Sequence, residues 1–219
     1  MIEKSTLQFL ADLKKNNTKE WFDANRKRYE AAKDNVQNIT GGLIKAIGVH
    51  DEDIALLLTK DCTFRINRDV RFSKSKAPYK TNISAIFSKG GKKADTAGFY
   101  VHVEPGGAFV AAGYWNPEPK KLASVRQEID YNFAEWKKIL AAKKFKEMFA
   151  DGLSKEDMLQ RPPKSYDVEN PAIEFIKLKS FIVTRQITDA ELQDNSFIKN
   201  IVSVFKAVKP MLDFLNTAE

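Results

Sequence analysis

The chain is short of the residues on which several common kinds of site depend. Its 219 residues include one cysteine, Cys62, and two histidines, His50 and His102. A single cysteine cannot form a disulfide within the chain, and two histidines cannot build a multi-histidine metal site. We therefore expect Cys62 to be packed rather than reactive, and we predict no metal and no cofactor.

Long apolar runs are missing as well. No segment approaches the ~20 consecutive apolar residues of a membrane-spanning helix, and the stretch from Met1 to Leu7 lacks the apolar run of a signal peptide. We expect a cytoplasmic protein with no membrane partner. The composition, with 43% hydrophobic and 30% charged residues and 15 Phe, favours a globular fold with an aromatic-rich core.

Familiar catalytic and nucleotide-binding signatures are absent too. No Gly-x-Gly-x-x-Gly follows a predicted strand, and there is no His-Glu-x-x-His and no Gly-x-Ser-x-Gly. The glycines and lysines of Ser88–Lys93 resemble a phosphate-binding loop, but they lack its Gly-Lys-Ser/Thr spacing. These absences argue against a P-loop, a zinc peptidase and a serine hydrolase of the nucleophile-elbow type.

Apolar residues at helical spacing predict helices at both ends of the chain. The sequence Ser5-Thr-Leu-Gln8 predicts a capping box for a helix to about Lys15, and Thr18 a cap for a helix to about Gly48. Another capping box is predicted at Thr188-Asp-Ala-Glu191. The second half contains further helical stretches from Pro119 to Leu140, over 143–150 and 171–179, and from about 196 to 212.

Between these parts the pattern changes to that of strands. Apolar and polar residues alternate, or β-formers dominate, over 62–66, 82–88, 99–104 and 108–115, and a short strand over 180–185 could join them. Strands with no helices between them indicate an antiparallel sheet. We predict one α+β domain over 1–219: a helical arm over about 1–58, a central antiparallel sheet over about 60–116, and a helical half over about 119–219 that covers one face.

Positive charge is concentrated in one segment. From Lys60 to Lys93 the chain has ten Lys or Arg and two Asp, a balance of +8, whereas the whole chain carries +7. The segment also contains Phe64, Phe72 and Tyr79. A charge that is confined in this way and interleaved with aromatic residues indicates a place where an anion is held.

This segment supplies most of the candidate binding residues. Asp69 could orient Arg68 or Arg71 through a bidentate pair, and Tyr79 could donate a hydrogen bond or stack on a ligand. Alternatively, the arginines pair internally with acids such as Glu104, Glu118 and Glu128. The predicted anion ligands, with one arginine from the helix that follows Pro119, are Arg65, Arg68, Arg71, Lys76, Tyr79, Lys80 and Arg126.

The predicted strand over 99–104 offers a second surface. Tyr100, His102 and Glu104 share the face opposite the apolar residues of this strand. The imidazole of His102 is suited to proton transfer near neutral pH, so His102, Tyr79 and Asp69 are the catalytic candidates. The alternative is that His102 is a half-buried strand residue held by a hydrogen bond.

Three stretches together carry a family resemblance: Asn16–Phe22, Phe64–Thr81, and Gly113–Pro119 with Arg126 beyond it. They resemble the signature of a bacterial and fungal family, the domain of unknown function 2461. Ser75 stands where the family motif would have an acidic residue. The resemblance spans most of the chain and implies a shared fold, but it implies no reaction, because the family carries no established activity.

Three functions are consistent with these observations. The first is the binding of an anionic ligand, either a small molecule with a phosphate or carboxylate group or a nucleic acid. The second is an enzyme that acts on an anionic small molecule, and the third is a structural or interaction protein whose arginines form internal salt bridges. We favour binding, and the sequence does not specify an oligomeric state.

Overall fold

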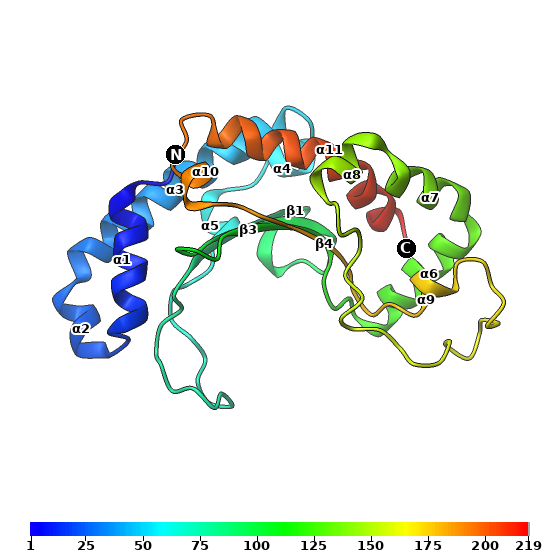
Figure 1. The fold of residues 1–219 in the computed structure, drawn as a ribbon, viewed down its shortest axis with the longest axis horizontal. Coiled ribbons are helices and arrows are strands. Elements are labelled where there is room, and N and C mark those ends of the chain that lie inside the picture. Colours follow the sequence, from blue (N-terminus) through cyan, green and yellow to red (C-terminus); the bar gives the residue numbers. More distant parts are fainter. Residues whose placement is uncertain (219) are drawn as a thin grey trace. The chain divides into compact units, whose positions relative to one another are not determined.

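The computed structural model describes residues 1–218, and its fold is of the predicted α+β class, with helices toward both ends and an antiparallel sheet (Figure 1). The helices and the one 3-10 helix, in chain order, are α1 (Lys4–Lys15), α2 (Lys19–Ala24), α3 (Arg26–Gly48), α4 (Glu52–Ala55), α5 (Thr59–Cys62), η1 (Gly91–Lys93), α6 (Pro119–Tyr131), α7 (Phe133–Ala141), α8 (Lys143–Met148), α9 (Ile173–Ile176), α10 (Asp189–Leu192) and α11 (Phe197–Thr217).

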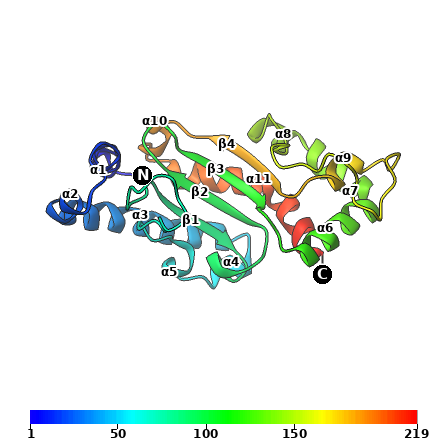
Figure 2. The ribbon, with the colours of Figure 1, turned by 90° about the horizontal axis from the view of Figure 1, so that it is seen from below.

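Four strands form the sheet, in the order β1 (Ile83–Ser88), β2 (Gly98–Val103), β3 (Phe109–Tyr114) and β4 (Phe181–Gln186) (Figure 2). The prediction that the strand near 180–185 joins the sheet is confirmed. Its neighbour β3 contains Gly113, which has a φ of 131°. A Cβ on Gly113 would collide with the carbonyl oxygen of Phe181, so this close approach of β3 to β4 requires glycine.

The contacts divide the chain into two compact units, each built from separate stretches of sequence. Unit 1 comprises Met1–Lys93, Tyr100–Val110 and Gln186–Val202. Unit 2 comprises Ala94–Phe99, Ala111–Arg185 and the residues from Ser203 onward. That the chain forms a single domain stays a prediction.

The strand predicted over 62–66 is wrong. Cys62 ends the short helix α5, in which the Asp61 carboxylate accepts the backbone N–H of Leu58 at 3.1 Å and so favours a turn of helix. Beyond it the chain makes only single bridges, from Thr63 to Ala85 and from Asn67 to Tyr79. The predicted alternation of burial still holds in part, because Ile66 is buried while its neighbours 65 and 67 are exposed.

Two predicted helices are each divided by an asparagine. The helix predicted from Thr18 to Gly48 divides at Asn25, whose side chain donates to the carbonyl of Trp21 at 2.9 Å. The helix predicted from Pro119 to Leu140 divides at Asn132, whose side chain donates to Glu128 at 2.7 Å. Asparagine favours such breaks because its short amide competes for hydrogen bonds near the backbone.

The three predicted helix caps have different outcomes. The hydroxyl of Thr18 accepts the backbone N–H of Trp21, and the box at Thr188–Glu191 forms as predicted. The box at Ser5 is wrong, because α1 begins at Lys4 and the Ser5 hydroxyl donates to the Glu3 carboxylate. The helices predicted over 143–150 and 171–179 form over the shorter ranges of α8 and α9.

Each unit has its own aromatic core. In unit 1, the ring of Phe22 stacks on Tyr79 with centroids 3.9 Å apart. In unit 2, the fully buried Trp136 contacts Phe214 at 5.0 Å between centroids. Among residues 1–218, no helix combines the length and the apolar content that crossing a membrane requires.

Candidate functional site

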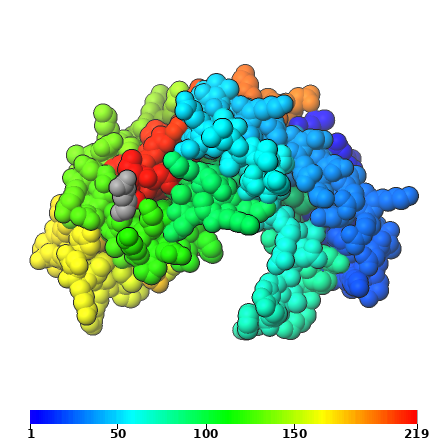
Figure 3. Space-filling view, turned by 180° about the vertical axis from the view of Figure 1, so that it is seen from behind, coloured from blue at the N-terminus to red at the C-terminus, as the bar shows by residue number. Residues whose placement is uncertain are grey.

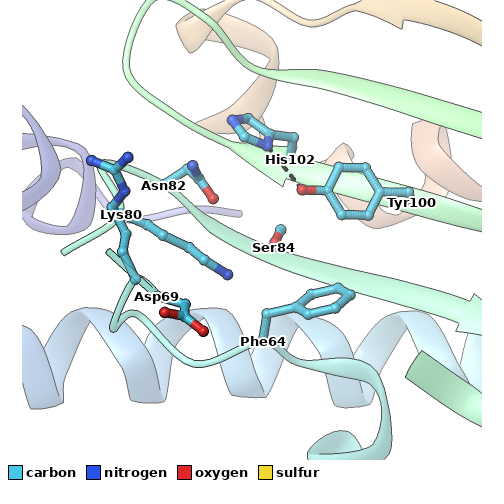
Figure 4. Close-up of a pocket in the computed structure, with 8 residues that line it drawn as sticks. Phe64, Asp69, Lys80, Asn82, Ser84, Tyr100 and His102 are labelled. Carbon is cyan, nitrogen blue, oxygen red and sulfur yellow. Dashed lines mark hydrogen bonds between the residues drawn. The ribbon is translucent and has the colours of Figure 1, made fainter. Parts of the chain in front are cut away.

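A pocket of about 440 Å³ opens in unit 1 beside β1 and β2. Three stretches of chain supply its walls: the segment 64–69, the segment 80–84 that leads into β1, and β2 (Figure 4). In Figure 4 the ammonium group of Lys80 points into the space between Asp69, Ser84 and Phe64. The lining residues are Phe64, Arg68, Asp69, Lys80, Asn82, Ser84, Tyr100 and His102.

The alternation of side chains between the two faces of an extended chain explains how the sequence places these residues. Successive residues of a strand point to opposite faces, so Lys80, Asn82 and Ser84 project toward the pocket together. The intervening Ile83 is buried on the other side. The same alternation brings Tyr100 and His102 of β2 to the pocket, as the sequence predicted for their shared face.

Lys80 is the half-buried cation of the pocket. Its Nζ lies 5.4 Å from the ring centroid of Phe64, and it has no ion pair within the part of the chain that the structure describes. Burial lowers the pKa of Lys80 below its ordinary value, and repulsion from Arg65 lowers it to a smaller extent. A bound anion would counter both effects, because it would stabilise the charged ammonium.

Arg68 brings a second positive charge to the same wall. Its Nη1 donates to the Ser75 hydroxyl at 3.2 Å and to the Ala77 carbonyl at 3.3 Å, and its Nη2 donates to the Ser73 hydroxyl at 3.1 Å. All three acceptors are neutral. The guanidinium therefore holds the loop 69–77 in place, and it has no ion pair among residues 1–218.

The predicted pairing of Asp69 occurs with Arg71 rather than with Arg68. Arg71 donates from Nε to Oδ1 at 2.9 Å and from Nη2 to Oδ2 at 2.6 Å, which is a bidentate pair. These hydrogen bonds hold the pKa of Asp69 below its ordinary value. The acid in the pocket wall is thus already engaged by a loop arginine.

A hydrogen-bonded chain runs along the face of β2. The Tyr100 hydroxyl lies 3.0 Å from His102 Nδ1, and His102 Nε2 lies 3.2 Å from Glu104 Oε2. Because a carboxylate can only accept, Nε2 carries the proton toward Glu104, and Nδ1 of a neutral ring then accepts from Tyr100. Ser84 of the neighbouring strand lines the same pocket as Tyr100.

The protonation states along this chain follow from burial and partners. Burial lowers the pKa of His102, although the hydrogen bond to Glu104 acts in the opposite direction. Burial also raises the pKa of Tyr100. For Glu104, burial acts to raise the pKa, but hydrogen bonds from Thr81 and His102 and the charge of Lys14 outweigh it, so the pKa lies below its ordinary value. Tyr100 and His102 are therefore neutral at pH 7 and Glu104 is charged.

The family comparison adds a finding to this geometry. The sequence model of the family described as "Conserved hypothetical protein (DUF2461)" matches residues 5–214. The chain belongs to this family. The match confirms the resemblance seen in the three motifs. No curated protein and no solved structure matches the chain.

In this DUF2461 protein, four predicted ligands from the basic segment do not line the pocket. One of them is Arg71, which is paired with Asp69 as described above. Tyr79 is 6% exposed, and its backbone N–H and carbonyl both bond to the Asn17 side chain, so it is a core residue of unit 1. Lys76 Nζ donates to the Val70 carbonyl in the exposed loop. Arg65 is exposed and lines a neighbouring pocket of about 270 Å³.

Arg126 belongs to unit 2, where it lines a different pocket of about 390 Å³ together with Tyr166. Its Nη2 donates to the Leu178 carbonyl at 3.0 Å, while its Nε is buried without a hydrogen-bond partner among the described residues. Burial lowers the pKa of Arg126. Arg126 therefore does not line the pocket that Arg68 and Lys80 share. Every residue that lines that pocket belongs to unit 1.

The polar residues that we did not predict in the DUF2461 pocket are Asn82 and Ser84, which complete its wall. Tyr100 and Glu104, in contrast, were expected to share a face with His102. The spacing of Lys80, Asn82 and Ser84 is the signal that could have identified them, since polar residues at every second position share a face. Within residues 1–218, no three His, Cys, Asp or Glu side chains are grouped to hold a metal ion.

Proposed function

We propose that this DUF2461 protein binds a small anion, with a phosphate or carboxylate group, in the pocket of unit 1. The observation that carries the proposal is Lys80, a half-buried ammonium with no ion pair among residues 1–218 that points into a pocket it shares with Arg68. A partly buried charge is costly unless it is paired, so such a site favours an anion.

The neighbouring groups suit the same ligand. Asn82 and Ser84 can donate hydrogen bonds to its oxygens, and Arg68 adds a guanidinium to the wall. The competing role, internal salt bridges, applies to Arg71, which pairs with Asp69, but within residues 1–218 it does not apply to Arg68 or Lys80. Glu104 interacts with Lys14, Thr81 and His102, and among the described residues no arginine forms an ion pair with Glu104, Glu118 or Glu128.

The direct test is titration with inorganic phosphate. Binding is measured by calorimetry and by the NMR chemical-shift changes of the Ser84 and Tyr100 amides. We expect Lys80→Gln to weaken binding by about 10- to 100-fold, as the loss of a charged hydrogen bond implies. The control is Lys27→Gln, which removes an equal charge from the exposed surface of α3. Equal phosphate affinity in wild type and Lys80→Gln, with no shifts in the pocket, would contradict the proposal.

A second candidate function is an enzyme that acts on the bound anion. The chain of Tyr100, His102 and Glu104 favours it, because it opens into the same pocket as Lys80 and could move a proton to or from a bound molecule. In a screen of phosphorylated small molecules by phosphorus NMR, His102→Gln should lose turnover but keep phosphate binding. Full turnover by that variant would exclude His102 as the acid or base.

A further inference from the structure

A second pocket in unit 1 adjoins the first. Its volume is about 270 Å³, and it shares two lining residues, Phe64 and Asn82, with the pocket of Lys80. Phe64 therefore stands in the wall between the two. No acidic residue lines the second pocket, whereas four cations do: Lys33, Lys60, Arg65 and Lys92.

The four cations differ in how far they are already engaged. Lys92 Nζ donates to the carbonyls of Lys60 and Thr63 at 2.5 and 2.7 Å, and Lys33 pairs with Glu30 at 3.4 Å. Neither the Lys60 ammonium nor the Arg65 guanidinium has an ion pair in the described chain. Both are exposed, so they are available to a ligand in the second pocket.

We propose that the two pockets form one extended site for single-stranded nucleic acid. The proposal rests on the proposed function and names its ligand: one phosphate lies at Lys80 and Arg68, another lies at Lys60 and Arg65, and the strand passes Phe64 between them. Cations that follow a backbone, combined with an aromatic ring on which a base stacks, are how proteins bind single strands without reading sequence.

The loop 69–77 extends the same chemistry beyond the pockets. It projects from unit 1 (Figure 3), and it carries Arg71, Lys74 and Lys76 around Phe72, which is 96% exposed. The guanidinium of Arg71 lies 5.8 Å from the ring centroid of Phe72. An exposed ring among cations is a further surface on which a base of the strand can stack.

The composition of the site favours a single strand over two other polyanions. Lys80, which is half-buried, and Arg68 line a pocket of about 440 Å³ beside the aromatic ring of Phe64, whereas a flat bilayer or the outer surface of a duplex presents phosphates but no unpaired base to such a ring. A flexible single strand presents both, because its backbone bends and its bases are unpaired. The loop with Phe72 is the part that a membrane surface would also bind, so the experiment includes vesicles.

The test titrates the whole protein into labelled thymidylates with lengths of about one, four and eight nucleotides. Binding is followed by fluorescence anisotropy. We expect affinity to rise about tenfold or more from the mononucleotide to the tetramer, because stacking and a second phosphate contact are gained. We expect the affinity of the longer strands to fall with salt, with a log–log slope of about −0.7 for each phosphate contacted.

Variants separate this inference from the proposed function. The double variant Lys60→Gln, Arg65→Gln should weaken octamer binding about tenfold and leave inorganic phosphate binding at Lys80 unchanged. The control Lys27→Gln should change neither. Phe64→Leu should reduce the gain with length while it preserves the apolar wall.

Each contrary result has its own meaning. If phosphate binds at Lys80 but affinity is independent of strand length, the extended site is wrong and the small-anion function stands. If inorganic phosphate does not bind at Lys80, the proposed function is wrong, and so is the extended site that rests on it. Tight binding to phosphatidylserine vesicles that Phe72→Ala abolishes, with weak binding of oligothymidylates, would replace the nucleic acid with a membrane surface.

Discussion

At the scale of single residues, His102 shows how burial determines a charge in the pocket. An unfolded histidine titrates near about pH 6.5, and burial gives His102 a lower pKa in the folded protein. The folded state then binds this proton more weakly than the unfolded state. The contribution to stability is therefore present above about pH 6.5 and is lost as the pH falls through the folded pKa.

We thus expect wild type to lose more of its free energy of unfolding than His102→Gln when the pH falls from about 7.5 to about 5.5. Urea denaturation at both pH values measures this. The window lies above the range in which Glu104 takes up a proton, since the pKa of Glu104 is below its ordinary value. His50→Gln, which changes an exposed histidine, should respond as wild type does. Identical pH responses of wild type and His102→Gln would show that burial has little effect on this imidazole.

At the scale of elements, Arg68 holds the loop 69–77 by three hydrogen bonds, which it donates to Ser73, Ser75 and Ala77. We expect Arg68→Gln to speed tryptic cleavage after Lys76 by about tenfold or more, because each lost bond is worth roughly 0.5–1.5 kcal/mol. Mass spectrometry of timed digests measures the rate. The control is Arg65→Gln, which removes a neighbouring exposed cation that forms no hydrogen bond with this loop among residues 1–218. Equal cleavage rates in the two variants would show that Arg68 does not hold the loop.

The elements also show which parts of the site a sequence can predict. Confined charge identified Arg68 and Lys80, and alternation in β2 placed Tyr100 and His102 on one face, because both are local properties of the chain. Local pattern did not indicate that Tyr79 stacks in the core, since its partner Phe22 lies far away in sequence. Nor could it show that the segment 80–84 faces β2, because that depends on strand pairing.

At the scale of the whole molecule, four elements run without interruption from one compact unit into the other. They are β2, β3, β4 and α11, each of which has residues in both units. Neither unit is a continuous piece of chain, so neither can complete its strands without the other. We therefore predict that the two units unfold in a single cooperative transition, as a single domain does.

Cys62 and Ile129 make this prediction testable. Cys62 is buried in unit 1, and burial raises the pKa of its thiol to about 11, so it should react with an aromatic disulfide reagent only after unfolding. Ile129 is fully buried in unit 2, and Ile129→Ala should lower the free energy of unfolding by about 2–5 kcal/mol. If the units unfold in one transition, Ile129→Ala in unit 2 must also lower the urea midpoint of Cys62 labelling in unit 1. The shift in that midpoint must equal the shift in the midpoint measured by circular dichroism. Glu135→Gln, an exposed change on α7, should move neither midpoint. A Cys62 midpoint that stays at the wild-type value would mean that the units unfold independently, and the single-domain prediction would then be wrong.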